Sequence, residues 1–370
     1  MIGACGLCSS FTARTAGCGY AQISANRTAA LNAMSPLSPS PPINDPQYSR
    51  RAWLTLAAAA AASLAAGCGS GSGTTEKFQA TFLQPWQSYE TLPVAEWRRR
   101  LKLTRDLGCN EIILQWSALY GGSYPWTMPE ELIQLLFEEG RSNGIGIRVG
   151  LPYDEGWWKV LSGKGTRRVS EFLDRTQAVC MDTLNNSRWP DQAGFRGWYL
   201  PYELDQYNWA TPERRELLVP WLSAISEASA KRSAQPLALS TFYSQVATTG
   251  TLAGLWGDIL DAVRLRPMLQ DGVGVAGLGN YAGLEPLRLL LRERNIPFDL
   301  IVELFEQLPS LPNSNDAFRA KPASGERIST QMQVARSFGA DRIVAFAVDP
   351  WLLSSSDDEL TFPYSWGSQV

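Results

Sequence analysis

From about residue 78 onward, the chain alternates short hydrophobic runs with longer segments in which apolar residues recur every three or four positions. The short runs are bounded by turn-forming residues and predict β-strands, whereas the longer period predicts amphipathic helices. Strands that alternate with helices along a chain form parallel sheets, so we expect an α/β fold. The predicted strands cover residues 79–83, 111–116, 145–151, 196–200, 237–242, 263–269, 299–304 and 342–348.

The helical stripes lie between these strands. The clearest one has apolar or small residues at the i, i+3, i+4 and i+7 spacing of a helix that buries one face. Gly108 and Gly339 follow two of the predicted helices, in the position where glycine often ends a helix. Beyond Trp351 the pattern predicts no eighth helix. The clearest stripe is Val169, Phe172, Leu173, Thr176, Val179 and Cys180.

Eight strand and helix units favour a closed (β/α)8 barrel, the TIM barrel, over an open doubly wound sheet. The open sheet typically carries a G-x-G-x-x-G turn after its first strand, and no such turn follows residues 79–83. A glycine-rich run at 272–277 follows the sixth strand instead and lacks the lysine of a phosphate-binding loop. We therefore expect one barrel domain over residues 78–370.

The first 77 residues predict an export signal and a linker. Arg50 and Arg51 precede an apolar stretch at 56–66, which is shorter than the roughly 20 residues of a membrane-spanning helix and fits a secretory signal. The arginine pair resembles a twin-arginine signal. The sequence that ends in Cys68 resembles the lipobox of bacterial lipoproteins, which implies lipidation of Cys68 and a membrane anchor in the cell envelope.

A signal stands near the start of a protein, so we expect translation to begin at Met34, with residues 1–33 outside the protein or without structure. The Gly/Ser run at 69–73 predicts a flexible tether. In the body of the chain, Cys109 and Cys180 are expected to be buried thiols. The protein is expected to be a monomer.

The composition narrows the chemistry. The chain has no histidine, which excludes Ser-His-Asp and Cys-His nucleophile systems and leaves acid and base roles to other side chains. Its 33 basic and 36 acidic residues give a formal charge of -3, which does not favour nucleic acid as a partner. The 14 tryptophans suit the apolar faces of sugar rings, although large domains also bury tryptophan in their cores. We expect no metal and no organic cofactor.

Polar and aromatic residues collect where the predicted strands end, and that end of a barrel carries the active site. Carboxylates, amides and aromatic rings suit a neutral, polyhydroxylated ligand, so we expect a carbohydrate there. The residues expected to contact it are Gln84, Trp86, Gln115, Trp116, Tyr153, Tyr202, Asp205, Asn208, Trp209, Tyr243, Asp271, Glu306 and Trp351.

Hydrolysis of a glycosidic bond needs two carboxyl groups, one protonated and one ionised. Glu203 follows the fourth predicted strand and Glu303 ends the seventh, so the two side chains can face each other across a bound sugar. Burial among aromatic residues is expected to keep a proton on Glu203. A glutamate at a strand end can also cap a helix or pair with an arginine. Asp205, Asp271 and Glu306 are the alternatives for either role.

One resemblance rests on four segments: Ile113-Leu114-Gln115-Trp116, Gly197-Trp198-Tyr199-Leu200-Pro201-Tyr202-Glu203-Leu204-Asp205, Leu269-Gln270-Asp271-Gly272-Val273-Gly274 and Val302-Glu303-Leu304-Phe305-Glu306. These segments resemble an uncharacterised family of bacterial barrel proteins that are similar to glycoside hydrolases. The resemblance covers about residues 78–350 and implies that Glu203 is the acid and base and Glu303 the nucleophile. In the larger hydrolase clan the first of these often follows an asparagine, whereas Tyr202 precedes Glu203 here.

We therefore expect a cell-envelope glycoside hydrolase that cuts an oligo- or polysaccharide and retains the configuration of the sugar. Two other classes fit the same residues. One is a glycan-binding lipoprotein without catalytic activity, and the other is a polysaccharide lyase with Tyr202 or Tyr243 as its base.

Overall fold

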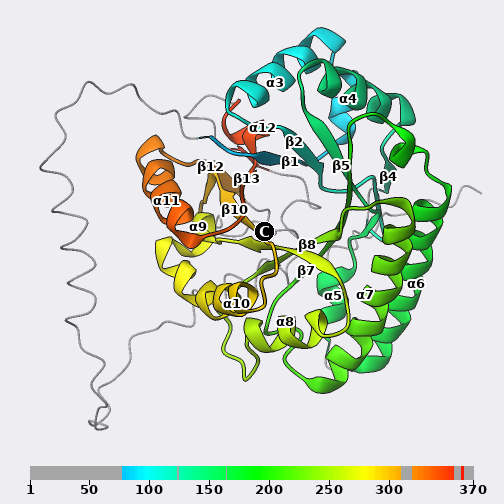
Figure 1. Ribbon diagram of the computed structural model, residues 1–370, viewed down its shortest axis with the longest axis vertical. Coiled ribbons are helices and arrows are strands. Elements are labelled where there is room, and N and C mark those ends of the chain that lie inside the picture. Colours follow the sequence, from blue (N-terminus) through cyan, green and yellow to red (C-terminus); the bar gives the residue numbers. More distant parts are fainter. Residues whose placement is uncertain (1–76, 123–124, 164, 310–318, 354–359, 362–370) are drawn as a thin grey trace, which may run out of the picture.

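The computed structural model describes residues 77–122, 125–163, 165–309, 319–353 and 360–361. The predicted signal, the tether and Cys68 lie outside these residues, as do most of the residues after Trp351. Within the described part, eight parallel strands close into a barrel in the order β1-β13-β10-β9-β8-β7-β5-β2, and helices surround it (Figure 1). The predicted (β/α)8 fold is confirmed.

Each predicted barrel strand is present, with ends that differ by a few residues. The largest difference is in the fourth strand, which continues to Leu204 and so contains Glu203. Its register against β8 shifts between Leu200 and Leu204, which marks a bulge next to Glu203. The barrel strands are β1 Ala80–Leu83, β2 Glu111–Leu114, β5 Gly146–Gly150, β7 Phe195–Leu204, β8 Leu237–Phe242, β9 Leu265–Gln270, β10 Asp299–Glu303 and β13 Arg342–Phe346.

The helices follow the predicted stripes and bury the apolar side of each. Several begin at a hydroxyl cap: Thr211 accepts a hydrogen bond from the backbone of Arg214, and Ser324 accepts one from Arg327. Gly339 ends its helix with a φ of 76°, as glycine permits. The long helices are α3 Val94–Asp106, α4 Glu130–Ser142, α6 Thr166–Asn186, α7 Pro212–Arg232, α8 Leu252–Leu260, α10 Tyr281–Glu293 and α11 Gly325–Phe338.

Short elements that the hydrophobic pattern did not predict lie after the barrel strands. β3 Ala118–Tyr120 pairs with β4 Trp126–Thr127 and with β6 Tyr153–Asp154. A second small sheet joins β11 Phe305–Gln307, β12 Arg319–Pro322 and β14 Leu360–Thr361. Short helices complete the described fold: α5 Trp157–Leu161, α9 Val273–Ala276, α12 Val348–Trp351, and the 3-10 turns η1 Gln87–Thr91, η2 Trp189–Asp191 and η3 Leu278–Asn280.

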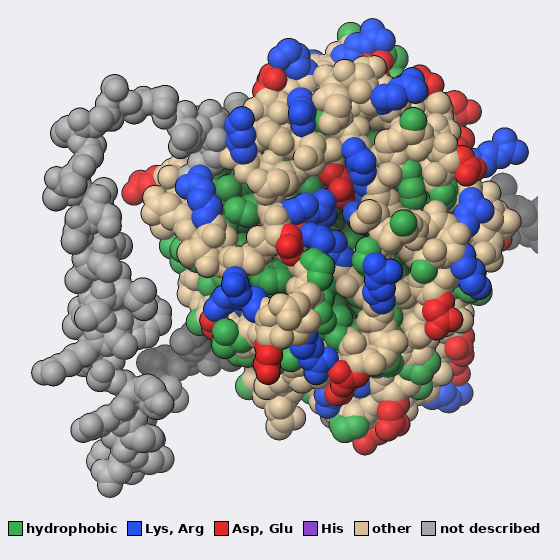
Figure 2. All heavy atoms as spheres, in the orientation of Figure 1, with side chains coloured by type: hydrophobic (Ala, Val, Ile, Leu, Met, Phe, Trp, Pro, Cys, Tyr) green, Lys and Arg blue, Asp and Glu red, His purple; other side chains and the backbone are tan. Residues whose placement is uncertain are grey.

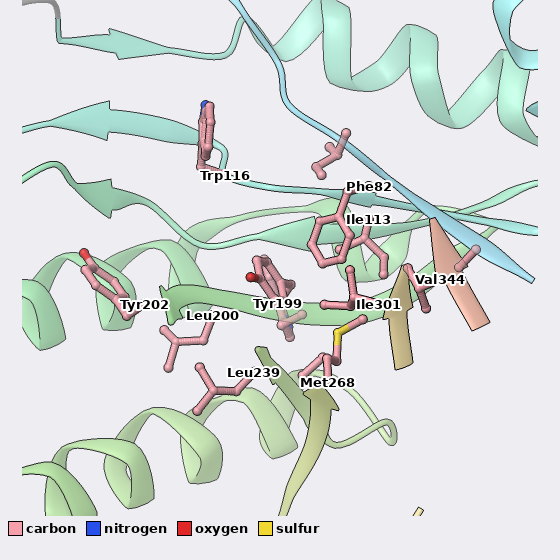
Figure 3. Packing of buried hydrophobic residues seen from close by; sticks show 14 of the residues in the cluster. Phe82, Ile113, Trp116, Tyr199, Leu200, Tyr202, Leu239, Met268, Ile301 and Val344 are labelled. Carbon is pink, nitrogen blue, oxygen red and sulfur yellow. The ribbon is translucent and has the colours of Figure 1, made fainter. Parts of the chain in front are cut away.

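The inside of the barrel is filled by side chains (Figure 3). Phe82, Ile113, Tyr199 and Ile301 meet there from four different strands, while Leu200 and Leu239 point away toward a helix. The rings of Phe82 and Tyr199 lie 5.2 Å apart, edge to face. Because side chains alternate along a strand, this layer fixes which residues point inward in the next layer.

The N-terminal ends of the strands carry a buried network of ion pairs. Arg148 donates to Glu111 at 2.7 Å, and Asp299 binds both Arg266 and Arg342. Arg342 also reaches Glu111, at 2.8 Å, so the network spans the barrel floor. Buried charges need such partners, which makes this end of the barrel structural.

Basic and acidic side chains are interspersed on the face of the molecule that Figure 2 shows. Cys109 and Cys180 are buried free thiols, as predicted. Among the described helices, none combines the length and apolar character that crossing a membrane requires.

Candidate active site

The predicted catalytic residues point into the barrel, one layer above the packed core. Side chains two positions apart share a face of a strand, so inward Ile301 implies that Glu303 also points inward. Glu203 lies in the irregular part of β7, and its hydrogen bond to Gln270 of β9 places its carboxyl group inside the barrel as well. The same rule applies to Gln84 after Phe82 and to Gln115 after Ile113. Residues from strands that are distant in sequence are therefore brought to one place, the barrel mouth.

Glu203 is held inside this mouth and is 6% exposed. Its Oε1 accepts a hydrogen bond of 2.6 Å from Nε2 of Gln270 on β9. Its backbone oxygen accepts one from the indole of Trp157 at 3.1 Å. Burial is the largest cause that raises the pKa of Tyr153 and of Tyr199, and the negative charge of Glu203 is the second. Both phenols therefore lie close to Glu203. The side chain of Glu203 therefore binds an amide and lies near two phenol rings.

Glu303, which is 2% exposed, is held by the glycine-rich turn. The backbone N–H of Gly274 donates to Oε2 of Glu303 at 2.9 Å. A side chain at position 274 would collide with the carbonyl oxygen of Phe305 at 2.6 Å and would come within 3.0 Å of Oε2 of Glu303. The glycine-rich turn at 272–277 therefore orients a carboxylate of the protein itself.

Asp271 fixes the backbone around Glu303 and is fully buried. Its Oδ1 accepts from the backbone N–H groups of Val273 and Glu303, and its Oδ2 accepts from Tyr281 and Gln331. Burial raises the pKa of Asp271 to about 6, although these hydrogen bonds oppose the increase. With its acceptors used in this way, Asp271 is placed to position Glu303.

A basic residue stands behind Glu303. Arg327, on the first turn of α11, donates to the backbone oxygens of Glu303 and Phe305 at 2.9 and 2.7 Å. The charges of Asp271 and Glu303 act on Arg327 to raise its pKa, against a larger lowering by burial. Arg327 therefore provides positive charge near Glu303.

On the side of the mouth formed by the ends of β1, β2 and β5, aromatic rings pack against one another. The rings of Trp86 and Trp116 lie 5.4 Å apart, and Trp116 stacks on Tyr153 at 6.5 Å. Trp116 and Tyr153 are buried, whereas Trp86 is half-buried. Gln84 and Gln115 stand next to these rings in the sequence and are 4% and 1% exposed.

Other predicted ligand-binding residues lie in structural roles. The side chain of Tyr202 is buried on the outer side of β7, against Trp157 and Trp221, and its hydroxyl accepts from the backbone of Asp154. Trp209 also packs on Trp157. This packing argues against direct contact between either residue and a ligand.

The acidic residues named as alternatives to Glu203 and Glu303 also differ in their contacts. Asp205 accepts from the backbone of Tyr207 and from both the backbone and the amide of Asn208, which forms a turn. Glu306 is exposed and pairs with Lys321. Of the three alternatives named from the sequence, Asp271 is the one in contact with the predicted pair.

The remaining aromatic residues lie at the edges of this region. Trp351 is buried against Phe305 at 5.4 Å. Tyr243 is half-buried and its ring lies against Gly283, where a side chain would collide with it. These two rings come from the eighth and the fifth barrel strands.

Residues that sequence reasoning did not select complete the site. Gln270 and Glu155 stand at strand ends among the amides and carboxylates that the sequence places at the mouth, but nothing in the sequence favours them over their neighbours. Gln331 is fully buried on α11 between the apolar residues of its stripe, and it donates to the backbone oxygen of Glu303. A buried glutamine in an apolar helical stripe is the signal that could have revealed it.

The chain belongs to the family described as domain of unknown function (DUF4434), whose model matches residues 78–358. It is 24% identical over 276 residues to the uncharacterized protein YbcH of Escherichia coli K12, a match that covers 70% of this chain and 86% of that one. The resemblance to an uncharacterised barrel family is thereby confirmed.

Among solved structures, a candidate α-L-fucosidase from Bacteroides thetaiotaomicron has a TM-score of 0.54 at 16% identity and covers 76% of this chain and 90% of its own. A GH99 endo-α-mannosidase from the same organism has a TM-score of 0.45 at 11% identity, over 74% of this chain and 84% of its own. The first of these supports the barrel fold.

In the described part of the chain, Cys, Asp and Glu residues form no group of three or more that could hold a metal ion.

Proposed function

We propose that the protein is a glycoside hydrolase in which Glu203 and Glu303 act together on a glycosidic bond. The observation that carries this proposal is their shared position. Both carboxyl groups belong to the inward layer above the core, and each accepts a hydrogen bond that fixes its orientation, from Gln270 or from Gly274. The arginines of the barrel floor bind Glu111 and Asp299 instead, so the structural ion pairs are at the other end.

The two environments suit different roles. Glu303 has a backbone N–H on its carboxylate and Arg327 close by, and both favour the ionised form that a nucleophile needs. Glu203 lies among phenol rings and a neutral amide, which favour the protonated form that a general acid needs. The assignment is the same as the one that the family resemblance implies.

The proposed reaction retains configuration. Glu203 gives its proton to the glycosidic oxygen while Glu303 attacks the anomeric carbon, and the leaving sugar departs as an alcohol. A covalent ester between Glu303 and the glycosyl unit remains. Glu203 then removes a proton from water, the hydroxyl oxygen bonds to the same carbon, and Glu303 leaves as a carboxylate. The acid is ready for another turnover.

The substrate of this proposal is a carbohydrate of the cell envelope or its surroundings, reached by a protein that is anchored through Cys68. The support is the sequence of the N-terminal region, with its arginine pair, apolar stretch and lipobox. Incorporation of a labelled fatty acid by the wild type, and its loss in Cys68→Ala, is the expected result. Equal labelling of the two proteins would contradict the anchor.

Hydrolysis is tested by a digestion screen against oligo- and polysaccharides, with release of reducing ends as the signal. The wild type should release them from at least one substrate, and Glu203→Gln and Glu303→Gln should lower turnover by about 10³-fold or more while they keep ligand affinity. Binding without turnover in the wild type would leave a glycan-binding protein. An unsaturated product that absorbs ultraviolet light would indicate a lyase.

A further inference from the structure

Three buried polar side chains on one side of the barrel mouth have unused hydrogen-bonding atoms. Gln84, Gln115 and Glu155 are 4%, 1% and 5% exposed. Within the described residues, no hydrogen bond reaches Nε2 of Gln84, Oε1 of Gln115 or either carboxyl oxygen of Glu155. A buried polar group without a partner costs about 1–3 kcal/mol, so native proteins leave few of them outside sites that bind something.

The two glutamines lie side by side. β1 and β2 are neighbours with Leu83 opposite Leu114, so the next residues, Gln84 and Gln115, leave adjacent strand ends. Both follow an inward residue by two positions, Phe82 and Ile113 respectively (Figure 3). Their amides therefore point into the mouth together. If the oxygen and the nitrogen of either amide change places, one buried polar atom of that amide still has no hydrogen-bond partner.

Glu155 reaches the same region from the end of β6. Its backbone N–H donates to the oxygen of Tyr120 at 2.9 Å and extends the pairing of β6 with β3. The preceding residue, Asp154, faces away and binds Arg175 of α6. Alternation along the strand then puts Glu155 on the side of Tyr153, and the charges of Glu155 and Glu203 both raise the pKa of that tyrosine.

We propose that Gln84, Gln115 and Glu155 form a subsite for a neutral sugar unit beside the bond that Glu203 and Glu303 cut. The amides and the carboxyl supply the donors and acceptors that vicinal hydroxyl groups require, and the half-buried Trp86 offers a ring face for the apolar side of the sugar. This inference rests on the proposed function for its position next to a scissile bond. The binding itself does not depend on catalysis.

The charges around the subsite exclude acidic sugars. Glu155 has Asp154 next to it and Glu203 across Tyr153, while Arg175 is bound to Asp154 on the other face. Burial, and then the charge of Asp154, raises the pKa of Glu155 to about 7, so its carboxyl group can donate a hydrogen bond below that pH. A uronic acid in this place would bring a further carboxylate against Glu155 and Glu203.

Tryptophan fluorescence of the inactive Glu303→Gln protein measures the binding, because the ligand is then not consumed. The probes are cellotetraose, mannotetraose and galactotetraose as neutral sugars and tetragalacturonate as the acidic one. We expect at least one neutral probe to bind and tetragalacturonate to bind at least 10-fold more weakly. Equal affinities, or no binding of any neutral probe, would overturn the subsite.

Second substitutions test the named side chains. Gln84→Met and Gln115→Met keep the size of the side chain and remove its polar atoms, so they should weaken binding of the neutral probe at least 10-fold while the melting temperature stays equal or rises. Glu155→Gln should keep binding at pH 6 and improve it at pH 8, where Glu155 is ionised. Gln134→Met and Glu138→Gln, on α4, are the matched controls and should change nothing.

The outcomes separate this inference from the proposed function. A wild type that binds a neutral probe through Gln115 but releases no reducing ends leaves the subsite in place and rejects hydrolysis. A wild type that hydrolyses, with Gln84→Met and Gln115→Met unchanged in affinity and in KM, rejects the subsite and leaves hydrolysis in place. If Gln84→Met and Gln115→Met lower the melting temperature but leave the affinity unchanged, the subsite is also rejected, because the two glutamines then serve the folded structure alone.

Discussion

Gln270 donates a hydrogen bond of 2.6 Å to Glu203, although β8 separates the strands that carry them. This bond has to cross the inside of the barrel, and it brings β9 into the environment of the predicted acid. The next residue, Asp271, accepts from the backbone N–H of Glu303. Two consecutive residues therefore tie the two predicted catalytic strands together, which makes the relative position of Glu203 and Glu303 a property of the barrel frame.

Gly274→Ala should damage catalysis more than binding. The added methyl group would lie 2.6 Å from the carbonyl oxygen of Phe305 and 3.0 Å from Oε2 of Glu303, so the turn or the carboxylate has to move. Since a small displacement of a nucleophile is costly, we expect kcat to fall by about 10²-fold with KM changed little. Steady-state kinetics on the substrate found by the digestion screen measures both.

Gly257→Ala is the control for this substitution. Gly257 lies in α8, and an added methyl group meets nothing within 4 Å. The control should keep wild-type kinetics and gain a few tenths to about 1 kcal/mol of stability from the better helix former. Equal kinetics for Gly274→Ala and Gly257→Ala would contradict the role given to the turn.

Tyr202→Phe tests the lyase alternative. The hydroxyl of Tyr202 accepts from the backbone of Asp154 at 3.0 Å and contacts the hydroxyl of Tyr120 at 3.2 Å, in a cluster between the barrel and its helices. Its removal should lower the free energy of unfolding by about 1–3 kcal/mol and leave kcat within a few-fold of the wild type. A loss of turnover of 10³-fold or more with unchanged stability would instead make Tyr202 a base.

The fold was predictable because each barrel strand is a short apolar run and each long helix has an apolar stripe. The ends of the strands were less certain where backbone geometry, and not residue type, decides them. The bulge before Leu204 extends β7 past Pro201, which a sequence pattern reads as the end of a strand. The small sheet of β3, β4 and β6 was not predicted because its strands are two or three residues long.

The sequence predicts which residues line the candidate site wherever the position of a residue along its strand determines the direction of its side chain. Glu203 and Glu303 follow inward residues, and the barrel places all such residues at one mouth. What the sequence could not supply is the partner of each side chain. Tyr202 precedes Glu203 and so faces the helices, whereas Gln331 reaches Asp271 and the backbone of Glu303 from the buried face of α11. Such contacts depend on tertiary packing.

Glu155→Gln should change the pH dependence of stability. Burial raises the pKa of Glu155 from its ordinary value to about 7, so the folded protein binds this proton more tightly than the unfolded chain does. The stabilisation from the bound proton is complete below about pH 4.5 and is lost as the pH rises through 7. The glutamine at position 155 in the variant does not titrate. The free energy of unfolding of the variant should therefore rise relative to that of the wild type by about 1–3 kcal/mol between pH 4.5 and pH 7, and the difference should then stay constant.

Urea unfolding of both proteins at pH 4.5, 6 and 8 measures this advantage. Glu138→Gln, on the exposed side of α4, is the control and should show no such trend. A difference between the wild type and Glu155→Gln that stays the same at all three pH values would show that Glu155 is ionised with its ordinary pKa.

Asp299→Ala should destabilise the barrel from its floor. Asp299 is fully buried and binds both Arg266 and Arg342, so its removal takes the bound carboxylate from Arg266 and leaves Arg342 with Glu111 alone. We expect a loss of about 3–5 kcal/mol in the free energy of unfolding. Asp106→Ala removes the exposed pair with Lys102 and should cost less than about 1 kcal/mol. Similar losses for the two variants would contradict a structural floor network.

The most direct test of the central claim is chemical rescue of Glu303→Ala with azide, on a substrate that has a good leaving group and that the wild type hydrolyses. If Glu303 is the nucleophile, the variant should lose turnover by about 10³-fold or more, and azide should restore part of it by attacking the anomeric carbon in place of the missing carboxylate. The product should be a glycosyl azide of inverted configuration, identified by NMR. Retained activity in Glu303→Ala, or rescue that appears with Glu203→Ala and gives an azide of inverted configuration, would contradict the assignment of Glu303.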